Sequence, residues 1–139
     1  MNAALIFWPV LAQIALTLAI YIVLARRKAG AVKSRAVNMR EAALDNRAWP
    51  ESVVKVSNNL ANQFESPVLF YALCLMLHAI DGVSLPALLL AWLYVALRVV
   101  HAGIHIGSNQ LSRRMPVFVL GTGVLLALLG LSAWQMAAS

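Results

Sequence analysis

Four long apolar segments constrain most strongly what this chain can fold into. They run from about Ala3 to Ala25, Val53 to Ile80, Leu85 to Ile106 and Met115 to Met136. A helix of roughly 20 apolar residues crosses the hydrocarbon core of a bilayer, because a helix satisfies its own backbone hydrogen bonds. With 62% hydrophobic and 12% charged residues, the chain is too apolar for an ordinary soluble domain. The sequence therefore predicts an all-α membrane protein, a four-transmembrane-helix bundle that forms a single domain over residues 1–139.

Basic residues concentrate in two of the three connections between these segments. The first connection holds Arg26, Arg27, Lys28, Lys33, Arg35, Arg40, Arg47 and Lys55. The third adds Arg113 and Arg114, whereas the second carries only Asp81. The positive-inside rule then places the first and third connections in the cytoplasm and both termini outside, in a cell inner membrane. The net charge of +6 fits basic anchors for anionic lipid headgroups, so membrane lipids are the expected partners and nucleic acid is not.

Polar side chains inside the second and third segments form three pairs whose residue numbers have the same sum. The pairs are Glu65 with Arg98, Asn62 with His101, and Asn58 with His105. If the two segments fold back about a turn near Asp81, the members of each pair lie at equal depth. Ionisable groups inside a membrane cost several kcal/mol unless they meet partners or water, which makes them functional candidates. The pattern predicts a ladder of polar pairs that opens toward the cytoplasm.

Helical spacing places the members of this ladder on single faces. Asn58, Asn62 and Glu65 recur at i, i+4 and i+7, and the three partners on the third segment recur in a similar way. Pro67 removes one backbone hydrogen bond, so we expect the second helix to bend next to Glu65. Gln13 and Thr17 share a face of the first segment, where helix packing is the expected role.

Several kinds of site remain open for the ladder. Charged and amide groups together can hold an anionic, peptide-like ligand, with apolar substrates arriving through the bilayer. The alternative is a structural hydrogen-bond network in which Glu65 only neutralises Arg98. Haem is disfavoured because His78 lies near the opposite end of the hairpin from the other two histidines, and no metal site is predicted. Cys74 is the only cysteine, so no internal disulfide can form.

Two stretches resemble a known family. The sequence N-Q-F-E-S-P-V-L-F starts at Asn62, and R-V-V-H-A-G-I-H starts at Arg98. Both are similar to motifs of the MAPEG family of integral membrane proteins, which includes microsomal glutathione transferases, leukotriene C synthase and prostaglandin E synthase. The resemblance implies a homotrimer of four-helix protomers that binds glutathione between neighbouring protomers, near the cytoplasmic side.

The resemblance also implies roles for single residues. Asn62 and Glu65 match the ligand-binding amide and carboxylate of the second helix, and Arg98 with His101 matches the pair on the third. Arg113 is similar to the arginine that stabilises the glutathione thiolate, a role for which Ser112 is a weaker candidate. A cation beside the thiol favours its ionised, nucleophilic form.

Two departures from the family pattern occur together. Asn58 stands where many active members carry arginine, and His105 stands where many carry tyrosine. Because both fall in the predicted ladder, we keep them as candidate ligand-binding residues of a reshaped site. The leading hypothesis is a glutathione-dependent transferase or peroxidase that acts on an apolar electrophile or a lipid hydroperoxide. The alternative is a lipid-binding or accessory membrane subunit without enzymatic activity.

Overall fold

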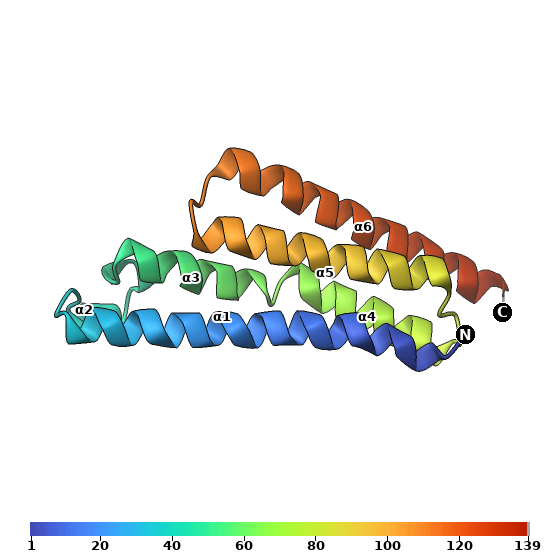
Figure 1. Ribbon diagram of the computed structural model, residues 1–139, viewed down its shortest axis with the longest axis horizontal. Coiled ribbons are helices and arrows are strands. Elements are labelled where there is room, and N and C mark those ends of the chain that lie inside the picture. Colours follow the sequence, from blue (N-terminus) through green and yellow to red (C-terminus); the bar gives the residue numbers. More distant parts are fainter. Residues whose placement is uncertain (139) are drawn as a thin grey trace.

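A computed structural model describes residues 1–138 and confirms the predicted all-α membrane bundle. The helical elements are η1 (Ala3–Ile6), α1 (Phe7–Lys33), α2 (Met39–Ala42), η2 (Asn46–Ala48), α3 (Glu51–Asn62), α4 (Ser66–Ala79), α5 (Leu85–Ile106) and α6 (Leu111–Ala138). Four stretches are long and apolar enough to cross a membrane: Ala3–Lys33, Glu51–Ala79, Leu85–Ile106 and Leu111–Ala138. The start of η1 and the end of α6 lie near the α4–α5 turn, whereas α2 and the α5–α6 connection lie toward the opposite end (Figure 1).

Two helix boundaries differ from the expected ones. The first helix continues beyond Ala25 to Lys33, because the Ala, Arg and Lys residues that follow are good helix formers. The fourth helix begins at Leu111 and not at Met115, so Pro116 lies inside it and not in its first turn. Both extensions carry basic residues, which places helical turns at the level of the expected headgroup layer.

The second span is interrupted at the predicted bend. α3 ends at Asn62 and α4 begins at Ser66, with Pro67 in the first turn of α4. In that position the missing N–H of proline has no intrahelical partner to lose. The span therefore consists of two shorter helices, and the residues from Gln63 to Glu65 form the connection between them.

The α4–α5 hairpin closes through a tight turn at the predicted place. Asp81 has φ 52°, a left-handed conformation that aspartate tolerates better than most residues. The N–H of Gly82 donates to the carbonyl of Leu77 at 2.9 Å, which satisfies a carbonyl at the end of α4. The second and third spans consequently run antiparallel, and α5 packs most extensively against α6.

The buried side chains form two apolar clusters. The larger one includes Ile6, Phe70, Leu77, Ala91, Tyr94 and Leu128. The smaller one contains Ile20, Val56 and Ala102. On α1, the buried Gln13 and Thr17 fall between Ile6 of the first cluster and Ile20 of the second. A layer of buried polar groups thus lies between two apolar ones.

Candidate functional site

A buried arginine stabilises the interruption of the second span. Arg98 of α5 is only 3% exposed, and its Nη2 donates to the carbonyl of Asn62, the last residue of α3, at 3.3 Å. The carboxyl end of a helix carries partial negative charge and unsatisfied carbonyls, so a cation there is favourable. The guanidinium therefore caps α3 and holds the backbone of Asn62 in place.

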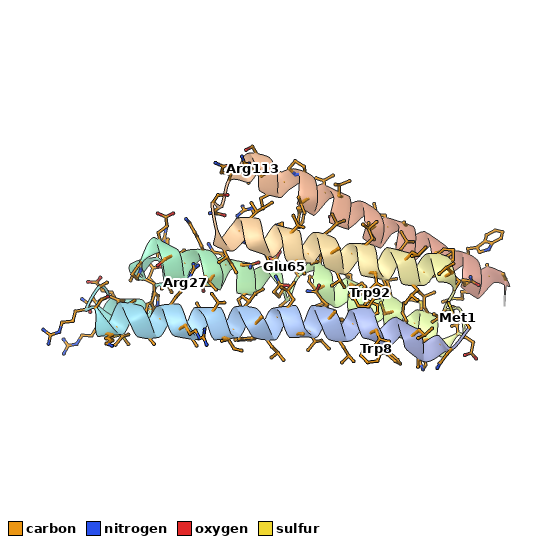
Figure 2. All side chains as sticks on the ribbon, in the orientation of Figure 1. Met1, Trp8, Arg27, Glu65, Trp92 and Arg113 are labelled. Atoms are coloured by element: carbon orange, nitrogen blue, oxygen red, sulfur yellow. The ribbon has the colours of Figure 1, made fainter. Side chains whose placement is uncertain are left out.

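The predicted ion pair between Glu65 and Arg98 is wrong. Glu65 is exposed in the connection between α3 and α4 (Figure 2), and no carboxylate lies within ion-pair distance of Arg98 among residues 1–138. The reason is the end of α3 at Asn62, because the i+7 spacing holds only within one continuous helix. Glu65 remains close enough to Arg98 to interact with it electrostatically.

Neither of the two remaining predicted pairs forms as predicted, and the contact of Asn62 is displaced by one helical turn. Nδ2 of Asn62 lies 3.4 Å from Nδ1 of His105, instead of contacting His101 as predicted. Because an amide nitrogen only donates, Nδ1 of His105 accepts this hydrogen bond. Asn58 is exposed and does not contact His105, since the interruption shifts α3 along α5. The second and third spans still carry a polar contact, but its register is not the one expected from the turn alone.

Four side chains therefore come together, and we call them the charged cluster: Asn62, Arg98, His101 and His105. The rings of His101 and His105 lie 5.7 Å apart, and the ring of Phe118 lies 6.0 Å from that of His101. Two buried nitrogens, Nε of Arg98 and Nδ1 of His101, have no hydrogen-bond partner. Such atoms cost free energy in an apolar interior unless a water or a ligand satisfies them.

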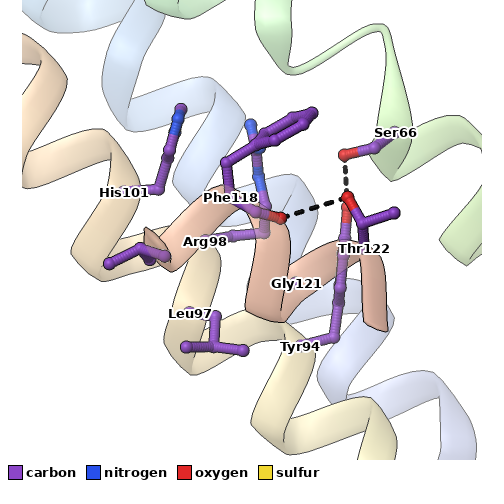
Figure 3. Close-up of a pocket in the computed structure, with 9 residues that line it drawn as sticks. Ser66, Tyr94, Leu97, Arg98, His101, Phe118, Gly121 and Thr122 are labelled. Carbon is purple, nitrogen blue, oxygen red and sulfur yellow. Dashed lines mark hydrogen bonds between the residues drawn. The ribbon is translucent and has the colours of Figure 1, made fainter. Parts of the chain in front are cut away.

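A small cavity adjoins this cluster. Its volume is about 10 Å³, close to the space that one water molecule needs. The walls come from α4, α5 and α6 and include Ser66, Tyr94, Arg98, His101 and Thr122 (Figure 3). Ser66 Oγ and the hydroxyl of Tyr94 lie 2.9 Å apart and form a hydrogen bond.

A second polar group lies between α1 and α3, where Gln13 packs against a neighbouring helix as expected, but the sequence argument missed its partners. Nε2 of Gln13 donates to Oε1 of Gln63 at 2.9 Å, and Nε2 of Gln63 donates to Oδ1 of Asn59 at 3.2 Å. All three side chains are buried, and we call them the amide network. Two signals were available in the sequence: the four-residue spacing of Asn59 and Gln63, and a lone glutamine within the apolar first segment.

The candidates for thiolate stabilisation lie at the start of α6. Ser112 and Arg113 are exposed, and Figure 2 shows Arg113 at the start of α6, next to the α5–α6 connection. Arg114 is half-buried and donates from Nη1 to Oδ1 of Asn109 at 2.6 Å. Arg114 is also the arginine of this pair that acts electrostatically on both histidines of the charged cluster. Within this chain, Asn58, Glu65, Ser112 and Arg113 remain outside the charged cluster.

Comparison with known proteins gives one match. The model of the MAPEG family matches residues 5–134, nearly the whole chain. No curated protein and no solved structure matches the chain.

Proposed function

Because the chain belongs to the MAPEG family, which covers glutathione-dependent transferases and peroxidases and related members, we propose that it is a glutathione-dependent enzyme of the membrane. It would conjugate glutathione to an apolar electrophile or reduce a lipid hydroperoxide. The observation that carries the proposal is the polar outer face of the second span. Asn58 and Glu65 are exposed there, within a segment long and apolar enough to cross the bilayer. A carboxylate facing lipid is costly, so protein, water or a ligand must cover it.

A homotrimer with glutathione between protomers would cover this face. Glu65 would bind the amino group of the tripeptide, while Asn58, Asn62 and His105 would donate or accept hydrogen bonds along its backbone. Arg98 and His101 are buried, so they would position Asn62 and His105 from the interior of the bundle. We also propose that residues 1–139 form a single four-helix domain in the inner membrane of the cell. Both termini would lie outside, and the first and third connections would lie in the cytoplasm.

The proposed chemistry uses the sulfur of glutathione. Arg113, assisted by Ser112, would stabilise the thiolate, with the thiol proton released to solvent. In conjugation the sulfur forms a bond to an electrophilic carbon, and the leaving group departs with its electron pair. In the peroxidase reaction two glutathione molecules are oxidised to the disulfide, and the hydroperoxide is reduced to an alcohol and water. The exposure of Arg113 and Ser112 fits a thiol that is bound at the protomer surface.

The test is ultraviolet absorbance of the thiolate in purified protein with glutathione, followed by turnover with chlorodinitrobenzene and with a lipid hydroperoxide. Arg113→Ala should weaken the thiolate signal, whereas Arg47→Ala, a change at another exposed arginine in the first connection, should leave it unchanged. Glu65→Gln should raise the glutathione concentration needed for half-saturation, with Glu41→Gln as its exposed control. Absence of both the thiolate signal and turnover with either substrate would overturn the enzymatic proposal.

A lipid-binding or accessory subunit is the second candidate. The specific observation in its favour is an apolar groove of about 470 Å³ between α4 and α6, within the range of small-molecule sites. The absence of an arginine at Asn58 removes a clamp for a carboxylate of glutathione. If glutathione raises the unfolding temperature but no turnover is detected, the result would favour a lipid-binding or accessory subunit.

A further inference from the structure

The interruption of the second span leaves two helix ends of opposite polarity inside the bundle. The carboxyl end of α3 carries partial negative charge, and Arg98 caps it through the carbonyl of Asn62. The amino end of α4 carries partial positive charge. Glu65 occupies its N-cap position, but the side chain makes no capping hydrogen bond. The positive end therefore lacks the counter-group that the negative end has.

The small cavity lies at this positive end. Ser66, the first residue of α4, lines it together with Tyr94 and Arg98 of α5 (Figure 3). Arg98 is 3% exposed, and its Nε–H has no hydrogen-bond partner. Ser66 and Tyr94 share one hydrogen bond, so one of their two hydroxyl hydrogens remains for another acceptor. The hydroxyl of Thr122 is already used, because it donates to the carbonyl of Phe118 at 3.1 Å.

The positive charge beside the cavity is not neutralised at short range. Among residues 1–138, no carboxylate lies within ion-pair distance of Arg98. Glu65 acts on the guanidinium only over a longer distance, and its side chain is exposed. A buried guanidinium without a partner is costly inside a membrane span. A negative charge in the cavity would offset that cost.

The size of the cavity limits what can supply this charge. Its volume of about 10 Å³ is close to the space that one water molecule needs. A monatomic anion fits such a space, whereas a polyatomic anion such as phosphate or sulfate does not. Water fits by size but supplies no charge. Amino ends of helices bind anions in many proteins, and those of interrupted helices do so inside membranes.

We propose that the cavity binds a chloride ion between Arg98 and the amino end of α4. Nε–H of Arg98 and the free hydroxyl hydrogen of the Ser66 and Tyr94 pair donate to the ion. Nδ1 of His101 also lacks a partner, and it donates as well in the tautomer that carries its hydrogen there. The ion and Arg98 thus stabilise both helix ends at the interruption. This site goes beyond the proposed function, because it requires neither glutathione nor Arg113.

The experiment measures thermal unfolding of the detergent-purified full-length protein without glutathione, as chloride replaces gluconate at constant ionic strength. Chloride should raise the unfolding temperature along a saturating curve, since a ligand that binds only the folded state stabilises it by mass action. Bromide should act in the same way, and crystals soaked in bromide should show anomalous scattering beside Nε of Arg98. Equal unfolding temperatures in chloride and gluconate, or a bromide peak only elsewhere, would overturn the proposal.

Two matched glycine variants on α6 locate the ion. Gly121 lines the cavity, and a Cβ there would lie 4.0 Å from Cε2 of Tyr94, an ordinary contact distance. Gly121→Ala should therefore fold normally, occupy space in the cavity and lose the response to chloride. Gly123→Ala is the control, because its Cβ would meet nothing within 4 Å and Gly123 does not line the cavity. A response that survives in Gly121→Ala, or that is lost in both variants, would refute the site.

A charge variant tests the guanidinium. Arg98→Met should lose the difference between its unfolding temperatures in chloride and in gluconate, and this difference is independent of a general loss of stability. Arg113→Met, at an exposed arginine outside the cavity, should keep it. A full chloride response in Arg98→Met would overturn the proposal. Glutathione turnover is measured separately, so a chloride response without turnover, or turnover without a chloride response, separates this inference from the proposed function.

Discussion

The second span carries two polar groups on different sides, and they differ in charge and in the space beside them. The amide network joins α3 to α1 through neutral side chains, with Gln63 making hydrogen bonds in both directions. The charged cluster joins α3 to α5 through a guanidinium and two imidazoles, and it adjoins a cavity. The amide network links two helices, whereas the charged cluster adjoins a cavity that a further ligand could enter.

The comparison teaches that burial alone does not identify a functional site in this chain. Gln13 is as fully buried as any core residue, and Oε1 of Gln13 and Nδ2 of Asn59 have no hydrogen-bond partner, yet their network consists of neutral amides only. Arg98 has to be kept charged inside the bundle, and the cap on α3 uses only part of its donors. Both groups therefore have unused hydrogen-bonding atoms, and the charged cluster is distinguished by its buried positive charge and by the cavity that adjoins it.

The largest expected effect is on the amide network. Gln63→Leu should lower the free energy of unfolding by about 2 to 4 kcal/mol, because it leaves the amides of Gln13 and Asn59 buried without a partner. Glutathione affinity should stay unchanged. The measurement is the midpoint of unfolding in mixed detergent micelles. Adding Gln13→Leu should recover part of the lost stability. If Gln63→Leu keeps its stability but loses glutathione binding, the amide network would be the ligand site and not the structural one.

A smaller loss is expected at the cap on α3. Arg98→Met should cost about 1.5 kcal/mol, since it removes a charged hydrogen bond to Asn62 but also relieves the desolvation of the guanidinium. A double-mutant cycle with Glu65→Gln should be additive to within about 0.5 kcal/mol, because the two side chains do not pair. A coupling well above that value would restore the direct ion pair predicted from the sequence.

The contrast between Arg98 and Glu65 shows where the sequence argument succeeded and where it failed. The number and order of the spans, the hairpin turn near Asp81 and the bend near Pro67 were all predictable, because they follow from hydropathy and from proline chemistry. The contact register was not, because it assumed one continuous helix through Glu65. Whether a bend is a kink or a full interruption depends on the cap that Arg98 provides, and this cap is a tertiary interaction.

The choice between Asn58 and Asn59 failed for a related reason. The two are adjacent in the sequence, and only the packing of α1 against α3 decides which one is buried. The sequence argument selected Asn58 because it paired with His105 in number. The structure buries Asn59 instead, and it uses Gln13 of the first span as the partner of Gln63.

A weaker coupling is expected within the charged cluster. Asn62 and His105 share a single hydrogen bond of 3.4 Å, and such bonds inside membranes average about 0.6 kcal/mol. A cycle of Asn62→Leu and His105→Leu should therefore show a coupling of about that size. Each single variant should weaken glutathione binding more than it lowers stability. If stability falls while binding is retained, the cluster serves the fold alone, and the comparison with the amide network collapses.

The smallest effect is expected in the exposed first connection, which serves as a baseline for both groups. Asp45 accepts a hydrogen bond from the backbone N–H of Arg47 at 2.9 Å, and this bond lowers the pKa of its carboxyl below the ordinary value of 3.8. A lowered pKa stabilises the folded turn above the ordinary value, and the contribution is lost as the pH falls through the lowered one. Protection of the Arg47 amide against hydrogen exchange should therefore decrease in strong acid, and Asp45→Ala should remove the pH dependence. Unfolding midpoints and glutathione binding should not respond to this change, because the carboxyl is exposed and lies outside both polar groups. A response in either would show that the first connection is coupled to the bundle, and the two sides of α3 could then no longer be compared as independent regions.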